Sequence, residues 1–329
     1  MHLTGQFSRR WCLRRILYGL SGASLLRAAS LSELTWDAAL PARAGGGQTR
    51  AAERRYRAEA HVIVLGITLF HRADVGGGSA VWRESPLTQG GTLRFLEFTG
   101  FSLPDRAAGL NRIGFIREMA RLGESGATES IYFGLMTSSP EESAEEARKA
   151  IESHSAEAVY SAIEGRVAAG EVESVLAHFS APAKWTIRNQ DELIEVAHKA
   201  LAETPKTPLE ANSRAAGEST FLQSLARLLR ESFSSGGAEQ QTSYIYNGHR
   251  YRLSLRRATD AKATGQYRKR GAIGQGSEVL RASGQVRREA GGKEHNFRLW
   301  FDPGAEMPIP LRIEYQAKSY LHLVFDAEA

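Results

Sequence analysis

The C-terminal stretch from Asn296 to Ala329 constrains the fold more than any other part of this chain. Three short runs rich in aromatic and β-branched residues are separated by a Pro/Gly-containing turn and by residues 316–319. Such runs, bounded by turn residues, are typical of consecutive antiparallel strands. In the second run Leu311, Ile313 and Tyr315 alternate with polar residues. This alternation predicts a sheet with one packed face and one solvated face.

Strand-like patterns also fill the N-terminal part of the chain. Tyr56–Phe70 predicts one strand that enters the core and bends at Gly66, and the Gly-rich stretch Val75–Val81 predicts a flexible hairpin or bulge. The spacing of these glycines fits no phosphate-binding motif. Four further strands are expected at residues 81–84, 92–98, 114–122 and 130–136. The last two form a hairpin that turns at residues 123–126, although residues 114–122 also suit an amphipathic helix.

The middle of the chain combines helix signals with two short strand patterns. Ser139-Pro140-Glu141-Glu142 predicts a helix start and a helix over residues 139–151, because it combines an N-cap serine, a first-turn proline and a glutamate. Two more helices are predicted over residues 189–204 and 219–233, with short strands at 158–163 and 171–179 and a linker at 206–217. The order of strands, helices and strands favours the α+β class with a mainly antiparallel sheet and about three inserted helices.

The N-terminal arm, residues 1–44, carries six arginines and two acidic residues, so most of the formal net charge of +5 belongs to it. Ser8-Arg9-Arg10-Trp11-Cys12-Leu13 resembles the twin-arginine export motif, and a short, mildly apolar stretch follows it. This arm predicts an exported, periplasmic protein with a signal-like segment of about 44 residues. The alternative is a disordered basic arm on a cytoplasmic protein. Cys12 is the only cysteine, which excludes an intrachain disulfide.

Two groups of segments resemble the domain-of-unknown-function family 3108 of exported bacterial envelope proteins. Ala58–Ile67, followed by a Gly-rich turn, is similar to the opening strand pair of that family. Ser283–Val286, Phe297–Asp302 and Met307–Glu314 are similar to its closing strands. The resemblance implies a curved, half-barrel-like antiparallel sheet and a location outside the cytoplasm. It supplies no activity and no site residues.

We therefore expect a signal-like arm at residues 1–44 and a single α+β domain at residues 45–329. The domain has terminal strand segments at about 54–136 and 242–329 and a helical insertion at about 139–236. No later apolar run reaches the length of a membrane span. We expect no integral span in the mature chain.

Charge is unevenly distributed along the domain. Residues 250–293 hold twelve Lys/Arg and three acids, whereas residues 138–173 hold nine acids and three bases. Tyrosines interleave with the basic segment, as they do in many proteins that bind nucleic acid or other polyanions. The simpler interpretation is a solvated sheet face. The candidate polyanion-binding residues are Arg256, Arg257, Arg268 and Arg270.

No catalytic motif is present, and the histidines form no ligand pair at metal-binding spacing. We expect no cofactor, no metal and no catalytic residues. The first hypothesis is a non-enzymatic envelope protein whose sheet binds an apolar or lipid-like ligand or a partner protein. The alternatives are a cytosolic nucleic-acid or polyanion binder, with nucleic acid the less favoured partner, and an exported hydrolase without a recognisable motif. The ligand-binding candidates of the first hypothesis are Trp300, Leu311 and Tyr315, which we expect to line the apolar side of the sheet, with Arg252 and Arg312 near its rim.

Overall fold

The computed structural model describes residues 48–64, 67–138, 157–169, 171–205, 207–208, 219–231, 239–246, 248–292, 294–318 and 321–328. The signal-like arm and the helix expected at residues 139–151 lie outside these ranges. The described residues form one antiparallel sheet of 14 strands. Its strands are β1 (Arg50–Val64), β2 (Ile67–Pro86), β3 (Thr92–Ser102), β4 (Ile113–Leu122), β5 (Thr128–Ser138), β6 (Glu157–Ala168), β7 (Glu171–Pro182), β8 (Thr207–Pro208), β9 (Gln240–Tyr246), β10 (His249–Thr259), β11 (Leu280–Arg288), β12 (His295–Phe301), β13 (Arg312–Lys318) and β14 (Leu321–Ala327).

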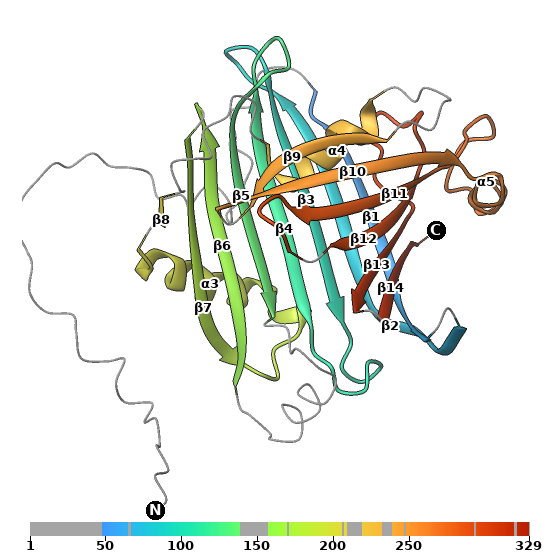
Figure 1. The fold of residues 1–329 in the computed structure, drawn as a ribbon, viewed down its shortest axis with the longest axis horizontal. Coiled ribbons are helices and arrows are strands. Elements are labelled where there is room, and N and C mark those ends of the chain that lie inside the picture. The colour runs from blue at the N-terminus through green and yellow to red at the C-terminus, as the bar shows by residue number, and fades with distance from the viewer. Residues whose placement is uncertain are drawn as a thin grey trace, which may run out of the picture.

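The first and last of the described strands meet in the middle of this sheet. The strand order runs from β8 through β7 to β1, continues with β14, and then descends to β9. Residues 56–62 of β1 pair with residues 321–327 of β14. In Figure 1 the sheet curves so that β9 to β12 cross in front of the long strands β3 to β6. The predicted α+β class, with a curved, unclosed and mainly antiparallel sheet, is confirmed.

Three helices accompany the sheet in the described part of the chain: α3 (Gln190–Glu203), α4 (Phe221–Arg230) and α5 (Ala261–Lys269). The first two match helices expected from the sequence. The third was not expected, because residues from 242 onward were predicted to be β. Its N-cap is Asp260, whose side chain accepts a hydrogen bond from the Ala263 N–H. None of the described helices is both long and apolar enough to cross a membrane.

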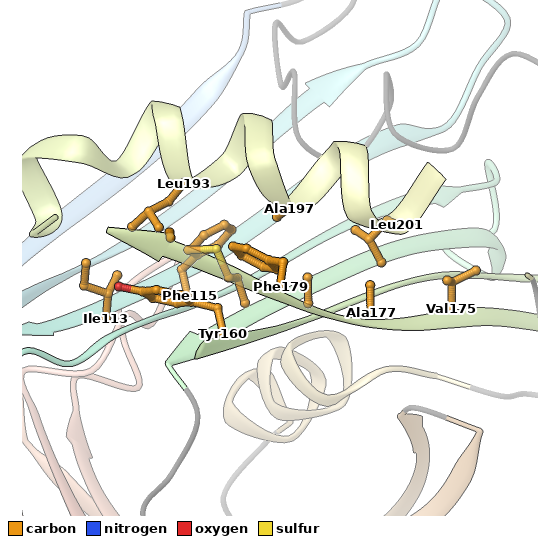
Figure 2. Close-up of a cluster of buried hydrophobic side chains, with 12 residues drawn as sticks. Ile113, Phe115, Tyr160, Val175, Ala177, Phe179, Leu193, Ala197 and Leu201 are labelled. Carbon is orange, nitrogen blue, oxygen red and sulfur yellow. The ribbon is translucent and has the colours of Figure 1, made fainter. Parts of the chain in front are cut away.

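Helix α3 covers one face of β4 to β7. Its buried residues Leu193, Ala197 and Leu201 pack on alternate residues of these strands, among them Phe115 and Tyr160. Figure 2 shows these side chains between the helix and the sheet. The intervening residues of β4 to β7 point to the opposite face and pack against Ile245 of β9. Strands β4 and β5 are therefore buried on both faces, whereas in β6 and β7 only the part near β9 is, because Val159, Leu176 and His178 are exposed.

Helix α4 lies on that opposite face, and two buried glutamates hold its ends. Glu118 of β4 accepts hydrogen bonds from the Leu222 and Gln223 N–H groups at 2.9 and 2.8 Å, at the start of the helix. Burial raises the pKa of Glu118 to about 7, even though these hydrogen bonds favour the charged form. At the other end, Arg230 binds Glu84 of β2 at 2.8 Å. These contacts fix α4 between β2 and β4.

Several expectations about the N-terminal strands are wrong in detail. The expected single strand at 56–70 is two strands, because the chain reverses between Val64 and Ile67, which pair with each other. The glycines of residues 76–78 form no hairpin, since they lie within β2 and pair with both β1 and β3. The bulge lies just before them, where β1–β2 pairing jumps from Ala58–Gly76 to Ala60–Arg72. Residues 62–70 are nearly all apolar, so no polar turn residues mark the reversal.

The hairpin expected at 114–136 is confirmed as β4 and β5 with a turn at residues 123–127. The helical alternative for residues 114–122 is wrong. The short strands expected at 158–163 and 171–179 are also confirmed, but each extends to 12 residues in β6 and β7. The middle segment therefore contributes two full strands to the sheet as well as helices.

Candidate functional site

The C-terminal strands present one strongly polar face, which we call the polar face. Direct cross-strand partners share a face of a sheet. In this way Arg256 on β10 shares a face with Ser283 on β11 and Arg298 on β12. The same row of partners continues through β13 and β14 to β1 and β2. Its charged and imidazole side chains include Arg252, Arg256, Arg281, Arg287, Arg298, Arg312, Glu314, Asp326, His322, Arg57, Glu59, His61 and His71.

Five exposed arginines from three neighbouring strands form the basic part of this face, and we call them the arginine stripe. They are Arg252 and Arg256 of β10, Arg281 and Arg287 of β11, and Arg298 of β12. Arg252 and Arg287 are direct cross-strand partners. Like charges directly opposite each other repel, so this pairing lowers the stability of the fold. This points to a role for these arginines other than folding.

Acidic neighbours neutralise only part of the stripe. Arg298 lies 3.0 Å from Glu314, Arg287 lies 3.6 Å from Glu294, and Arg252 lies 4.0 Å from Glu289. Arg256 and Arg281 make no ion pair with any other residue in the described ranges. The stripe therefore keeps a surplus of positive charge that is open to solvent.

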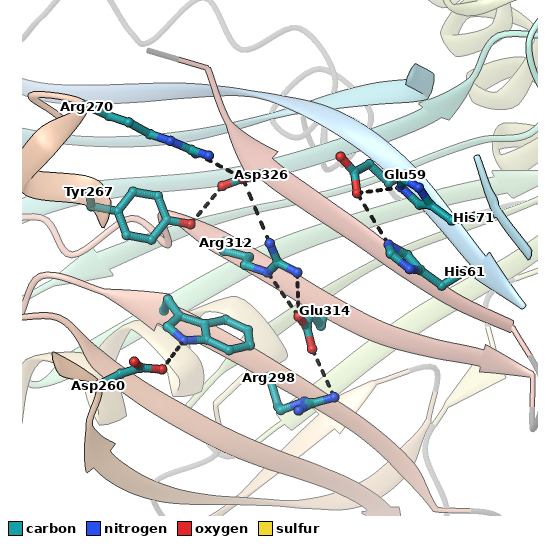
Figure 3. A network of polar contacts seen from close by, with 11 residues as sticks. Glu59, His61, His71, Asp260, Tyr267, Arg270, Arg298, Arg312, Glu314 and Asp326 are labelled. Carbon is teal, nitrogen blue, oxygen red and sulfur yellow. Dashed lines mark hydrogen bonds and ion pairs between the residues drawn. The ribbon is translucent and has the colours of Figure 1, made fainter. Parts of the chain in front are cut away.

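A polar cavity of about 380 Å³ lies beside the stripe, between α5 and strands β12 to β14. The guanidinium of Arg312 is central to it. Arg312 contacts Glu314 at 2.8 Å and Asp326 at 3.9 Å, and it lies 5.5 Å from the ring centre of Trp300. Figure 3 shows these side chains together. The charged side chains that line the cavity are Asp260, Lys262, Arg270, Arg312, Glu314 and Asp326.

Contacts from α5 fix the wall of this cavity. Tyr267 donates a hydrogen bond to Asp326 at 2.7 Å, and Arg270 lies 3.1 Å from the same carboxylate. Burial, together with the Asp326 carboxylate, raises the pKa of the Tyr267 hydroxyl well above its ordinary value. Asp260 accepts hydrogen bonds from the Ala263 N–H and from the Trp300 indole, and these lower its pKa. The cavity therefore holds three cations and three carboxylates in a fixed arrangement.

The ligand-binding candidates from the sequence do not share one surface. Trp300 pairs with Arg312 and faces the polar side, where it is buried with Leu311 against α5. Tyr315 pairs with Phe297 and points to the opposite, apolar face. The expectation that Trp300 and Tyr315 line one apolar side is therefore wrong, because the register of β12 and β13 separates them. Arg252 belongs to the arginine stripe.

The four polyanion candidates are also dispersed. Arg257 is buried and binds the Glu231 carbonyl at 2.7 Å, and Arg268 binds the Ser277 carbonyl at 2.9 Å. Arg270 belongs to the cavity, and only Arg256 belongs to the stripe. The sequence analysis missed Arg281, Arg287 and Arg298. Strict alternation in β11 and β12 is the signal that would have placed them with Arg256.

Three of the four tyrosines that interleave with the basic segment lie on the other face, and the fourth, Tyr267 of α5, is buried in the wall of the polar cavity. Tyr244 and Tyr251 stack with ring centres 5.3 Å apart, and Tyr244 also packs on Phe221 of α4. Tyr246 packs on Phe133 of β5 at 5.4 Å. These rings are consequently part of the core, and they offer no stacking surface next to the arginines.

One serine–histidine pair bears on the hydrolase alternative. The Ser161 hydroxyl lies 2.9 Å from Nδ1 of His178, between β6 and β7. No carboxylate in the described ranges orients this imidazole, and neither described cavity includes either residue. The pair lacks the third group and the enclosed site that a nucleophilic triad requires.

A histidine–carboxylate cluster lies where the polar face reaches β1 and β2. Oε2 of Glu59 is 3.3 Å from Nε2 of His61 and 3.1 Å from Nε2 of His71. These three residues could hold a metal ion, since one ligand atom from each lies within 4.8 Å of the others. Ten residues separate the two histidines in sequence, so only the β1–β2 pairing reveals them as neighbours.

Comparison with known proteins gives few matches. No family model matches the sequence, and no curated protein matches it. Among solved structures, the chain is similar to a beta-barrel-like protein of domain of unknown function DUF1849 from Brucella abortus. The identity is 10% and the TM-score is 0.42, and the match covers 85% of this chain and 98% of that chain.

Proposed function

We propose that this is an exported, non-enzymatic protein of the cell envelope that binds anionic lipid headgroups through the arginine stripe. The observation that carries the proposal is the exposed stripe itself, which places five guanidinium groups from β10, β11 and β12 on one sheet face. Guanidinium groups bind phosphate through two parallel hydrogen bonds, and they shed their hydration more easily than ammonium groups do.

The expected strength of this binding is moderate. A basic side chain near an anionic membrane contributes about 1 kcal/mol, so the five arginines contribute at most on the order of 5 kcal/mol, and the glutamates paired with Arg252, Arg287 and Arg298 lower this value. This gives reversible association that weakens as salt screens the charges. The binding surface is polar and exposed to solvent, and this narrows the expected lipid-like ligand to the headgroup of a lipid.

The face orientation of the aromatic residues favours lipid over nucleic acid. Proteins that bind single-stranded nucleic acid combine basic grooves with aromatic platforms on which bases stack. Here Tyr244 and Tyr251 stack on each other in the core, on the face opposite to the stripe. The binding test must therefore distinguish lipid binding from nucleic-acid binding, which is the alternative.

Export is part of the proposal, and it rests on the sequence of residues 1–44. The Ser8-Arg9-Arg10 motif and the resemblance of the strand segments to exported envelope proteins both support it. Fractionation of the native host, with N-terminal sequencing of the mature chain, tests it. A mature chain that begins near residue 45 and is recovered from the periplasm supports export, whereas an intact chain in the cytoplasm contradicts it.

Vesicle co-sedimentation tests the binding. We expect the protein to sediment with phosphatidylglycerol-containing vesicles at low salt and to remain in solution with pure phosphatidylcholine vesicles. The combined variant Arg252→Ala/Arg256→Ala/Arg287→Ala should lose at least tenfold in affinity for the anionic vesicles, because three of the five charges are removed.

The matched control removes the same charge from another surface. Lys184, Arg188 and Lys199 are exposed and lie on or just before α3. The control variant Lys184→Ala/Arg188→Ala/Lys199→Ala should bind like the unmodified protein. If both variants lost the same affinity for anionic vesicles, net charge alone would explain the binding, and the assignment of the stripe would be overturned. Salt-dependent DNA or RNA binding that is tighter than vesicle binding would favour the nucleic-acid alternative.

A further inference from the structure

We propose that Glu59, His61 and His71 form a binding site for a divalent transition-metal ion, and that Zn²⁺ is the best match. The cluster contains two imidazole nitrogens and one carboxylate oxygen. Figure 3 shows both imidazoles next to each other and directed at the Glu59 carboxylate, near the Arg312 network but separate from it. The site is independent of the arginine stripe.

The pairing of β1 and β2 builds the cluster. His61 and His71 are direct cross-strand partners, so their side chains project from the same face of the sheet. Glu59 lies two residues before His61 on the same strand and therefore on that face too. The β-bulge falls opposite Glu59, where residues 73–75 of β2 have no register partner, and Asp74 adopts a positive φ of 52°. Bulges re-aim side chains and are often found next to functional sites.

The distances between the ligand atoms fit an ion with tetrahedral coordination. Zinc lies about 2.0–2.2 Å from imidazole nitrogen and carboxylate oxygen, so neighbouring ligand atoms in a tetrahedral site are about 3.3 Å apart. Oε2 of Glu59 is 3.3 Å from Nε2 of His61 and 3.1 Å from Nε2 of His71. The two ring centres are 4.5 Å apart. An ion can enter with small side-chain rotations, while the backbone stays in place.

The chemistry of the ligands selects the metal. Imidazole suits Zn²⁺, Cu²⁺ and Ni²⁺, whereas Ca²⁺ and Mg²⁺ require mostly oxygen ligands. Two imidazoles and one carboxylate are also the protein ligands of many open zinc sites, in which a fourth position stays available. Binding requires neutral imidazoles, so it releases protons and weakens at acidic pH.

His322 of β14 lies outside the group of ligand atoms within 4.8 Å of one another, but it is next to His61 in the register and is therefore the candidate for the fourth position. It is the direct partner of His61 on the side away from His71, so the three histidines form one row across β2, β1 and β14. The other cluster side chains are partly open to solvent, with exposed fractions of 24% for His61, 34% for Glu59 and 48% for His71. An ion can therefore reach the cluster from solution.

The test uses the full chain without an affinity tag, because added histidines would bind the same ions. Titration of Zn²⁺ against a chromogenic chelator should reveal one site per chain in the micromolar range or tighter. His61→Ala and His71→Ala should each lower the affinity at least tenfold, and Glu59→Gln should lower it as well. Millimolar Ca²⁺ or Mg²⁺ should not compete.

His178→Ala is the matched control, because His178 is also an exposed histidine on a strand, far along the sheet in β7. It should leave the affinity unchanged. His322→Ala should lower the affinity by a smaller factor than His61→Ala, and an unchanged affinity would remove His322 from the site. Absence of binding, or equal binding by the His61→Ala and His71→Ala variants and the unmodified chain, would overturn the proposal. Circular dichroism of each variant checks that it is folded.

Discussion

Strands β4 to β7 and strands β10 to β12 belong to the same sheet but have different surroundings. In the first region α3 covers one face, and β9 covers the part of the other face formed by β4, β5 and the near ends of β6 and β7. In the second region α4 packs on the apolar face. The polar face, which carries the arginine stripe, is exposed to solvent. A charged residue in the first region must be held by buried partners, as Glu118 is, whereas the second region can carry charges for a partner outside the molecule.

Both regions contain the same local arrangement, so one kind of substitution can compare how tightly each region is packed. In each, a phenylalanine ring lies over a glycine on the neighbouring strand: Phe133 over Gly165 and Phe297 over Gly284. An added Cβ would come within 2.2 Å of the Phe133 ring at Gly165 and within 2.1 Å of the Phe297 ring at Gly284. Phe133 is fully buried, while Phe297 is only partly buried. The same clash is therefore relieved more easily in the second region.

The largest expected effect is on Gly165. Gly165→Ala should lower the free energy of unfolding by about 3 kcal/mol, because the Phe133 ring has no free space and the Glu173 carbonyl oxygen would lie 2.6 Å from the new Cβ. Gly284→Ala should lower it by about 1 kcal/mol, because the Phe297 ring can turn outward. Urea denaturation followed by fluorescence measures both values. Equal losses would show that the two regions pack equally tightly.

Gly265 of α5 provides a control for this pair. No atom lies within 4 Å of a Cβ added there, and the residue is in a helix. Gly265→Ala should raise the free energy of unfolding by up to about 1 kcal/mol, because alanine is the better helix former. A loss of stability at this position would mean that alanine substitution itself, and not the ring contact, causes part of the effects at the other two glycines.

The next effect concerns pH and the two glutamates that hold α4. Burial raises the pKa of Glu118 from 4.5 to about 7, so the folded protein binds a proton that the unfolded chain has lost. Stability should therefore fall as pH rises from about 4.5 to about 7, by at most about 1.4 kcal/mol per pH unit from this group.

Glu84 acts in the opposite direction below this window. Burial alone would raise its pKa, but hydrogen bonds from Arg230, Arg94 and Trp82 lower it to about 2. Its contribution to stability is present above pH 4.5 and is lost as pH falls towards 2. Thermal unfolding between pH 3 and pH 8 measures both slopes.

Glu118→Gln should flatten the slope between pH 4.5 and 7, while the exposed Glu203→Gln on α3 should leave it unchanged. An unaltered slope in the Glu118 variant would assign the pH dependence to other groups.

The smallest expected effect is on the arginine stripe. Arg287→Ala should change the free energy of unfolding by less than about 0.5 kcal/mol, and the change should be towards higher stability, because it removes a like charge opposite Arg252. Urea denaturation at low salt checks this value. A large loss of stability would show that the stripe holds the fold together and would weaken its assignment as a binding surface.

Local patterns predicted much of the fold. Alternation in residues 311–316 predicted β13, and the turn residues at 123–126 predicted the β4–β5 hairpin. Helix α5 was missed because its buried stripe consists only of Ala263 and Tyr267, which is too weak an apolar pattern to recognise. The turn after Val64 was hidden because apolar residues flank it on both sides.

The site was harder to predict, because it depends on register between strands. Trp300 and Tyr315 both look apolar in sequence, but pairing with Arg312 and Phe297 sends them to opposite faces. Likewise, His61 and His71 meet only because the chain reverses between them. A shift of one residue in either pairing would exchange the faces, and no local pattern fixes such a shift.

The pairing of β1 with β14 has a consequence for how the molecule is made. During synthesis the first strand emerges long before its central neighbour exists, and one of its edges stays open until the final strand arrives. A protease that removed β14 would divide the sheet in its middle, whereas removal of an edge strand would only shorten it. It would leave the backbone edges of β1 and β13 unpaired and prone to aggregation. The integrity of the sheet should therefore depend on residues 321–327 more than on the loops that the structure describes.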